Sequence, residues 1–281
     1  MYDNKILGAI VGDIVGSTRE WNNVKTEDFE LLPAGSRFTN DTVMTLAVAE
    51  WLMSDPTHSE RALVECMQRL GRKYPYAGYG GMFRRWLVTD NPEPYNSFGN
   101  GSAMRVSPVG LYANSMEEAL ELARITASVS HNHPEGIKGA QAIAAAIYLK
   151  RTEEFDTKGE IKRFIEKHFG YNLDVDLRAI RKDYTFDVTC QGSVPIAIMA
   201  YLQVDVSDPN TAAVLPETAD EIELVGLVSN ICVVSNAVVL QSKYPEATII
   251  VDAACTDSFD KSLHEKVLDV LSGFQVKVLG R

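Results

Sequence analysis

The sequence predicts a mainly α-helical protein with a small α/β segment near its C-terminal end. Up to about residue 203, apolar residues recur at helical spacing and no alternating strand pattern competes with them. After residue 220, strand-like and helix-like runs alternate, which is typical of βαβ units on a parallel sheet. We therefore expect a helical domain over residues 1–203, a connector over residues 204–220 and an α/β segment over residues 221–281.

Helices in the first domain are indicated by apolar residues three or four positions apart, a spacing that places them on one helix face. The last of these helices is expected to begin at Pro195, because proline is tolerated in the first turn of a helix. The expected helices span residues 7–15, 41–53, 60–70, 116–129, 136–149, 158–169 and 195–201.

The C-terminal segment follows a stretch of turn-forming residues that contains two prolines. Three strands are few for a parallel sheet, and the free edge of such a sheet needs a cover. Association of two copies of the chain through this segment would provide one. Strands are expected over residues 221–228, 248–251 and 275–279, and helices over residues 232–243 and 259–271.

Length and charge narrow the classes of partner. With 281 residues the chain can bury a sizeable core. It carries 27 Lys and Arg against 38 Asp and Glu, a net charge of −11. Nucleic acids and anionic membranes attract basic surfaces, so the charge argues against general binding to either.

The apolar runs of the sequence are too short to span a bilayer, and its N-terminus lacks the basic flank and cleavage pattern of a signal peptide. Four scattered cysteines without CxxC spacing indicate free thiols, so we expect a cytoplasmic protein.

Two N-terminal patterns have both a structural and a functional interpretation. Glycines four apart at positions 8, 12 and 16 favour close packing of helices, and the segment lacks the strand and the lysine of a phosphate-binding P-loop. The stretch Phe38-Thr39-Asn40-Asp41-Thr42 stands directly before an apolar helix, so it is either an N-cap or a set of oxygen ligands of the kind that Mg²⁺ prefers.

Several separated motifs together resemble one family. Residues 5 to about 203 resemble the ADP-ribosylglycohydrolases of the dinitrogenase-reductase-activating type. The stretches that carry the resemblance are Gly12-Asp13-Ile14-Val15-Gly16-Ser17 with Glu20, Phe38-Thr39-Asn40-Asp41-Thr42, Gly99-Asn100-Gly101-Ser102-Ala103-Met104-Arg105, Ser130-His131-Asn132-His133-Pro134 and residues 187–195. Their common order across two hundred residues is a specific signal, although each alone would be weak.

The resemblance implies an all-helical fold that cleaves the glycosidic bond joining ADP-ribose to an acceptor, using paired Mg²⁺ ions. It makes Glu20 and Asp41 the catalytic candidates, with the former as the acid/base or ligand-orienting carboxylate. The implied metal ligands are Thr39, Asn40 and Asp41, and the implied substrate contacts are Asn100, Gly101, Ser102 and His131. A lone histidine is more often a structural residue, so for His131 both interpretations stay open, and His133 before Pro134 is expected to lie at a helix entry.

Two departures from the family pattern weaken the expected metal site. Asn40 stands where the family has a second aspartate, so this position contributes no charge. The second metal motif of the family, Gly-Gly-Asp-Ser-Asp-Thr, is absent. The most similar stretch, at residues 208–213, is interpreted as a chance match. Because too few carboxylates remain to neutralise two ions, we expect one weakly held Mg²⁺ or none.

The C-terminal segment contains a candidate nucleophile, Cys232, at the expected start of a helix, where backbone N–H groups lower the pKa of a thiol. A small buried core residue is the alternative. Through the stretches 221–227, 231–237, Val251-Asp252-Ala253-Ala254-Cys255 and His264-Glu265, residues 216–279 resemble the end of isochorismatase-like cysteine hydrolases, the nicotinamidase group. Asn230 stands at a position where that family commonly has Asp. Nothing in residues 204–220 resembles the Asp and Lys that those enzymes use with the cysteine, so we do not expect Cys232 alone to hydrolyse an amide.

The chain is therefore interpreted as a fusion of two incomplete modules, and three functions follow. The first is Mg²⁺-dependent hydrolysis of an ADP-ribosyl bond, at full or impaired activity, with an ADP-ribosylated substrate or an ADP-ribose derivative as partner. The second is a non-catalytic ADP-ribose-binding or degenerate protein. The third is a nicotinamidase-like cysteine amidase at Cys232.

Overall fold

The computed structural model describes residues 6–26, 29–30, 32–152, 155, 157–203, 221–227, 246–257, 261–273 and 276–280. The chain divides into two compact units, Met1–Val204 and Asp205–Arg281. The first unit is helical and the second contains a three-stranded parallel sheet, so the predicted fold class is confirmed. In the described residues, none of the helices has the length and apolar character needed to cross a membrane.

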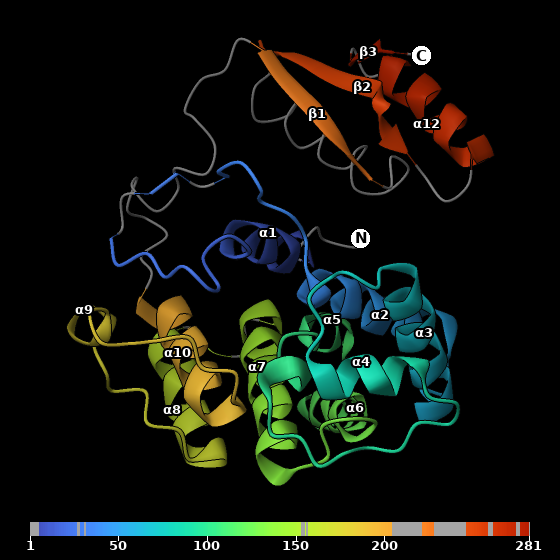
Figure 1. Ribbon diagram of the computed structural model, residues 1–281. Coiled ribbons are helices and arrows are strands. Elements are labelled where there is room, and N and C mark those ends of the chain that lie inside the picture. The colour runs from blue at the N-terminus through green and yellow to red at the C-terminus, as the bar shows by residue number, and fades with distance from the viewer. Residues whose placement is uncertain are drawn as a thin grey trace. The chain divides into compact units, whose positions relative to one another are not determined.

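The helical unit is built around α7, the longest helix, which packs against α5, α6, α8 and α10 (Figure 1). Small residues on α7, such as Gly139, allow this close approach: a Cβ at that position would lie 2.6 Å from the Cys190 sulfur. The helices are α1 (Ile6–Gly16), α2 (Asn40–Ser54), α3 (Glu60–Lys73), α4 (Gly81–Val88), α5 (Ser107–Tyr112), α6 (Met116–Ser128), α7 (Pro134–Thr152), α8 (Lys158–Phe169), α9 (Leu177–Ile180) and α10 (Cys190–Gln203), with one 3₁₀ turn, η1 (Asn100–Ser102).

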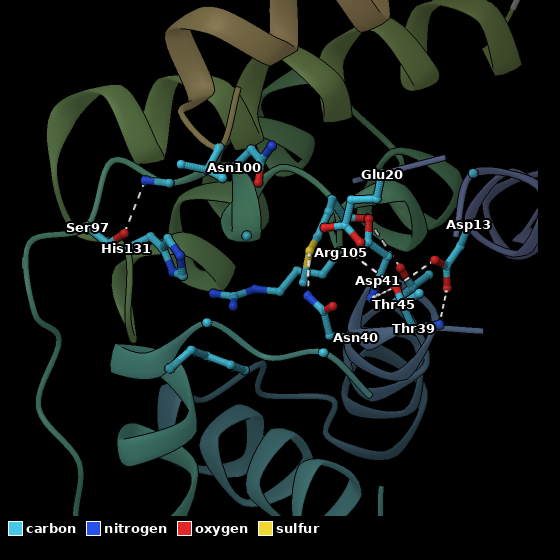
Figure 2. Close-up of a pocket in the computed structure, with 18 of the residues that line it drawn as sticks. Asp13, Glu20, Thr39, Asn40, Asp41, Thr45, Ser97, Asn100, Arg105 and His131 are labelled. Atoms are coloured by element: carbon cyan, nitrogen blue, oxygen red, sulfur yellow. Dashed lines mark hydrogen bonds between the residues drawn. The ribbon is translucent and has the colours of Figure 1, made fainter. Parts of the chain in front are cut away.

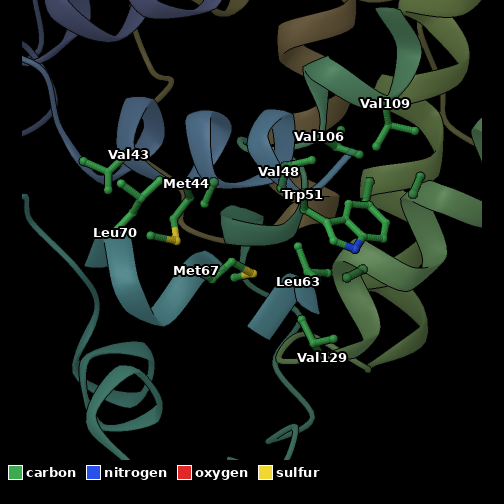
Figure 3. Packing of buried hydrophobic residues seen from close by; sticks show 14 of the residues in the cluster. Val43, Met44, Val48, Trp51, Leu63, Met67, Leu70, Val106, Val109 and Val129 are labelled. Atoms are coloured by element: carbon green, nitrogen blue, oxygen red, sulfur yellow. The ribbon is translucent and has the colours of Figure 1, made fainter. Parts of the chain in front are cut away.

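The core between α2, α3 and α5 is centred on Trp51, which is fully buried (Figure 3). Its indole N–H donates to the Ser59 carbonyl oxygen at 3.0 Å, so the ring is buried and its one polar group is hydrogen-bonded. The Ser59 hydroxyl in turn accepts from the Ala62 N–H and caps α3. This core fixes the N-terminal end of α2, which carries the candidate metal ligands.

The prediction for the last helix of the unit was wrong at its start. Helix α10 begins at Cys190 and contains Pro195 in its interior. Because proline has no N–H, the helix loses one backbone hydrogen bond there. Burial outweighs that loss, since Cys190, Val194 and Ile198 belong to the core shared with α7 and α8. The short elements α4, α5, η1 and α9 were not predicted, because they are too short to show a helical period.

The second unit has three parallel strands in the order β1 (Glu221–Leu227), β2 (Thr248–Asp257) and β3 (Lys277–Leu279). Ile222 pairs with Ile249, and Val251 pairs with Val278. Helix α12 (Lys261–Gly273) packs against β2 and β3. All three expected strands and the second expected helix are present, whereas the helix expected over residues 232–243 lies outside the described residues.

Candidate functional site

A cavity of about 870 Å³ collects most of the predicted site residues of the helical unit (Figure 2). Its walls come from α1, from the start of α2, from the turn before α4 and from the η1 loop. Figure 2 shows Asp13, Glu20, Thr39 and Asp41 together at one side of the cavity, and Ser97 and His131 at the other. The cavity therefore has an acidic end and an opposite end made by residues 99–102, here called the glycine-rich loop.

Helix α1 forms a cavity wall with its small residues. Ala9, Gly12, Asp13 and Gly16 share one helical face, and all four line the cavity. The expectation that the glycines pack closely against another helix was wrong for the described residues, since a Cβ at Gly8, Gly12 or Gly16 would meet nothing within 4 Å. The glycine face leaves room for a ligand instead.

The acidic end is organised by Asp13, a residue that was not among the predicted site residues. One carboxylate oxygen accepts from the Thr39 N–H at 2.7 Å and from the Thr42 hydroxyl at 2.6 Å, and the other accepts from the Thr39 hydroxyl at 2.6 Å. A single acidic residue in an otherwise apolar helix was the sequence signal that could have identified it. Asp13 therefore ties α1 to the N-terminus of α2.

Thr39 is the N-cap of α2, because its side chain accepts from the Asp41 N–H at 3.2 Å. The N-cap interpretation of residues 38–42 is thus confirmed for Thr39, and the same residue also lines the cavity. Asn40 directs its amide N–H₂ to the Met104 sulfur at 3.4 Å, and its backbone N–H donates to the Ala77 carbonyl oxygen at 2.6 Å.

Asp41 and Glu20 both line the acidic end, and both carry a raised pKa. Burial, followed by repulsion from Asp13 and Glu20, raises the pKa of Asp41 to about 7, although the hydrogen bond from Thr39 opposes the shift. Burial and the charge of Asp13 raise the pKa of Glu20 as well. The side chains thus concentrate negative charge that a cation or a proton would relieve.

The donor set fits one hard cation better than two. Mg²⁺ is usually bound through one or two carboxylates and keeps several water molecules, and Asp41 and Glu20 can supply that number. The Thr39 hydroxyl and the Asp13 carboxylate, by contrast, are hydrogen-bonded to each other. Across the described ranges, no group of three or more His, Cys, Asp or Glu side chains is arranged to hold a metal ion.

The glycine-rich loop forms the opposite wall, but its members differ in orientation. Asn100 and Gly101 line the cavity. The Asn100 amide donates to the Ser193 hydroxyl at 3.0 Å and to the Asp187 carbonyl oxygen at 3.3 Å, so it anchors the loop to the start of α10. Ser102 is fully buried, donates to the Gly136 carbonyl oxygen at 2.7 Å and is not among the cavity-lining residues. The structure therefore assigns Ser102 to the loop's attachment to α7.

His131 lies directly against this loop and lines the cavity, with 6% of its surface exposed. A Cβ at Gly101 would come within 2.9 Å of its Nε2 atom, so only glycine leaves the ring in place. His133 lies at the entry of α7, as expected, where its Nδ1 atom accepts from the Glu135 N–H at 3.1 Å.

The aromatic rim of the cavity was not predicted from the sequence. Trp21 follows Glu20, is 80% exposed, and lies beside Phe186 with ring centroids 5.0 Å apart. A hydrogen bond from the Lys25 ammonium to the Tyr184 carbonyl oxygen holds the same two segments together. The candidate nucleophile of the second unit, Cys232, lies outside the described residues.

The helical fold and this acidic, glycine-lined cavity define a known class of protein. The sequence model of the ADP-ribosylglycohydrolase family matches residues 4–236, and the chain belongs to that family. The match continues past the end of the helical unit at Val204.

Individual relatives agree with this assignment. The chain is 28% identical to the bovine (Bos taurus) ADP-ribosylhydrolase ARH3 over 207 residues, which are 62% of this chain and 56% of that protein. The human (Homo sapiens) ARH3 is 27% identical over 61% of this chain and 54% of its own length, and the zebrafish (Danio rerio) ARH3 is 30% identical over 53% and 47%. The chain thus spans about half the length of the curated relatives it matches.

Proposed function

We propose that this chain hydrolyses the glycosidic bond between ADP-ribose and an acceptor, as an Mg²⁺-assisted hydrolase of the dinitrogenase-reductase-activating type. The observation that carries the proposal is the convergence of Glu20 and Asp41 at one end of a cavity whose opposite wall includes Asn100 and Gly101. The matched relatives are named ADP-ribosylhydrolases, which supports the same reaction here.

The proposed chemistry assigns separate tasks to the two ends of the cavity. Glu20 exchanges a proton with the leaving group or with the attacking water, and its raised pKa suits a group that holds a proton in one state and releases it in the next. The glycine loop and His131 bind the remainder of the ligand, and Gly101 permits close backbone approach.

Asp41 and Glu20 would hold Mg²⁺, with Thr39 and the Asn40 amide oxygen as the further candidate oxygens. When bound, the ion would orient ribose hydroxyls and water near the anomeric carbon. The mutual repulsion of the three carboxylates supports a cation at this end, whereas the amide of Asn40 supports weak binding and one ion in preference to two.

The test is release of ADP-ribose from ADP-ribosylated arginine in the presence of Mg²⁺. We expect release by the unaltered chain and at least a hundredfold slower release by Asp41→Ala. The arginine linkage is one choice among several, so a serine-linked substrate is assayed in parallel. Absence of release from both substrates would reject the proposal.

The second candidate function is non-catalytic binding of ADP-ribose. It is supported by the hydrogen bonds between Thr39 and Asp13, which engage two side chains at the acidic end with each other. Calorimetry with ADP-ribose separates the two functions, because binding without turnover on either substrate favours the binding protein.

For the C-terminal part we propose an incomplete isochorismatase-like segment over residues 221–281, joined to the helical domain (1–203) through residues 204–220. The parallel order of β1, β2 and β3 supports it, and the third candidate function, amide hydrolysis at Cys232, depends on it. Ammonia release from nicotinamide that is lost in Cys232→Ser would support that activity.

The proposal also includes association of two copies of the chain through this segment and a cytoplasmic location. Light scattering of the whole chain tests the association.

A further inference from the structure

A chain of buried polar groups runs from Arg105 through Ser130 to His131, behind the glycine-rich loop. Arg105 is fully buried, and its guanidinium extends toward His131 (Figure 2). One guanidinium nitrogen, Nη2, donates to the Ser130 hydroxyl at 2.8 Å and also to the Thr126 carbonyl oxygen. The Ser130 oxygen lies 2.8 Å from His131 Nδ1.

The donors and acceptors among these three buried groups fix the tautomer of His131. A guanidinium has donors and no acceptor, so the Ser130 oxygen accepts from Arg105. The serine hydroxyl then has one proton to donate, and His131 Nδ1 is the acceptor within reach. If Nδ1 carried a proton instead, the buried hydroxyl of Ser130 would be left without an acceptor among the described residues, which is costly. Nδ1 is therefore unprotonated and Nε2 carries the hydrogen.

His131 and Gly101 both line the cavity, and the Nε2–H group lies beside Gly101 without a hydrogen-bond partner among the described residues. Beside it the buried Arg105 charge has no carboxylate partner within the part of the chain that the structure describes, and Nε and Nη1 of the guanidinium lack partners there too. A buried positive charge next to an unused donor favours an anionic acceptor.

We propose that Arg105 and Ser130 are positioning residues that fix His131 as the neutral Nε2–H tautomer, so that it donates a hydrogen bond to a phosphate oxygen of the bound ligand. The identification of that ligand as ADP-ribose rests on the proposed function, whereas the tautomer rests on the hydrogen bonds alone. His131 is then a ligand-binding donor, not a proton acceptor in the reaction.

The electrostatic surroundings agree with a neutral ring. Burial, with a further contribution from Arg105, lowers the pKa of His131 to about 3. Burial lowers the pKa of Arg105 to about 10, so the guanidinium stays charged at neutral pH. The other titratable neighbour, Tyr95, has its pKa raised by burial to about 12 and stays neutral. Neither of these two neighbours of the ring therefore changes charge between pH 5.5 and 8.

The first test reads the tautomer by long-range ¹H–¹⁵N correlation spectroscopy of the whole chain with ¹⁵N-labelled histidine. The chain has five histidines, and the resonances missing in His131→Gln assign the one of interest. We expect an unprotonated Nδ1 and a protonated Nε2 from pH 5.5 to 8, and a mixture of tautomers in Ser130→Ala. Ser130→Thr keeps the hydroxyl and should restore the single tautomer. A protonated Nδ1 in the unaltered chain, or a spectrum unchanged by Ser130→Ala, would overturn the proposal.

The second test uses two variants of His131, each of which places a side-chain amide near one of the two ring nitrogens. The Gln amide in His131→Gln can place a donor near the Nε2 position, whereas the Asn amide in His131→Asn reaches only the Nδ1 position. By calorimetry with ADP-ribose, we expect His131→Gln to bind within about fivefold of the unaltered chain and His131→Asn at least tenfold more weakly. Equal affinities, with matched thermal midpoints, would contradict the donor role. If the unaltered chain does not bind ADP-ribose, the proposed function fails while the spectrum still decides the tautomer.

Discussion

The Thr39 hydroxyl donates to an Asp13 carboxylate oxygen at 2.6 Å and joins α1 to the start of α2. Two elements 26 positions apart thereby share one polar contact at the acidic end of the cavity. None of the side chains described in α1 is fully buried, and Val11 is 45% exposed. We therefore expect this contact to contribute substantially to holding the helix in place.

Asp13→Ala should loosen α1 without unfolding the rest of the helical unit. The substitution removes the acceptor for the donors of Thr39 and Thr42, and hydrogen bonds to a charged group contribute about 1.5–3 kcal/mol each. Loss of repulsion with Asp41 offsets part of this, so we expect a net loss of roughly 2 kcal/mol and faster amide exchange in residues 6–16. The control is Ser17→Ala, which removes the hydrogen bond to the Ile14 carbonyl oxygen and the acceptor of the Arg37 N–H but leaves the Asp13 contacts in place. Unchanged exchange in α1 of Asp13→Ala would contradict the role of this contact.

Asp41→Asn should stabilise the metal-free protein at pH 8 while it removes Mg²⁺ binding. The pKa of Asp41 is raised from 3.8 to about 7, so the folded state holds a proton that the unfolded chain has lost. Stability is therefore full below pH 3.8 and falls as the pH rises to about 7. Because the side chain is half-buried and accepts from Thr39, we expect the variant to gain roughly 2 kcal/mol at pH 8 and little at pH 4.

The measurement is thermal unfolding at both pH values, with and without Mg²⁺. Addition of Mg²⁺ should raise the midpoint of the unaltered chain and leave that of Asp41→Asn unchanged. A variant that is less stable than the unaltered chain at pH 8 without metal would show that the carboxylates do not repel one another as described.

Ligand binding should be visible in the fluorescence of Trp21. The chain has three tryptophans, and Trp51 and Trp86 are buried with their indole N–H groups bonded to backbone carbonyl oxygens. Trp21 is exposed at the cavity rim, so we expect ADP-ribose to quench its emission and protect it from acrylamide. Trp21→Phe keeps a ring beside Phe186 and should bind ligand without the signal. A signal that persists in Trp21→Phe would place the ligand elsewhere.

Gly101→Ala should weaken ADP-ribose binding about tenfold at little cost in stability. The added Cβ would lie 2.9 Å from His131 Nε2 and would push the ring from its position beside the loop. Gly159→Ala is the matched control, because its Cβ would meet nothing closer than 3.7 Å and the position is outside the cavity. Calorimetry with ADP-ribose measures both variants, and equal affinity in the two would contradict the contact between His131 and the loop.

Helical periodicity predicted the long helices because an apolar stripe repeats along each of them. Helix α10 shows the limit, since Pro195 marked a start that tertiary burial of Cys190 moved one and a half turns earlier. The motif around Asp41 located one end of the cavity, and it was both a cap and a cavity wall.

Features that depend on orientation or on contacts between distant segments could not be predicted in this way. Spacing does not reveal which side of the η1 loop faces the cavity, so Ser102 was expected to contact substrate although it binds the Gly136 carbonyl oxygen. Asp13 binds Thr39 and Arg105 binds Ser130, each about 25 positions further along the chain. A local sequence pattern does not indicate contacts between residues so far apart.

The most direct test of the central claim compares ADP-ribose release by the unaltered chain, Glu20→Gln and Asp41→Asn at saturating Mg²⁺, with EDTA-treated protein alongside. The account predicts release by the unaltered chain, a loss of at least a hundredfold in either variant, and recovery of the EDTA-treated protein when Mg²⁺ is restored. Release that survives both substitutions would contradict it, because the reaction would then not depend on the two carboxylates at the acidic end of the cavity.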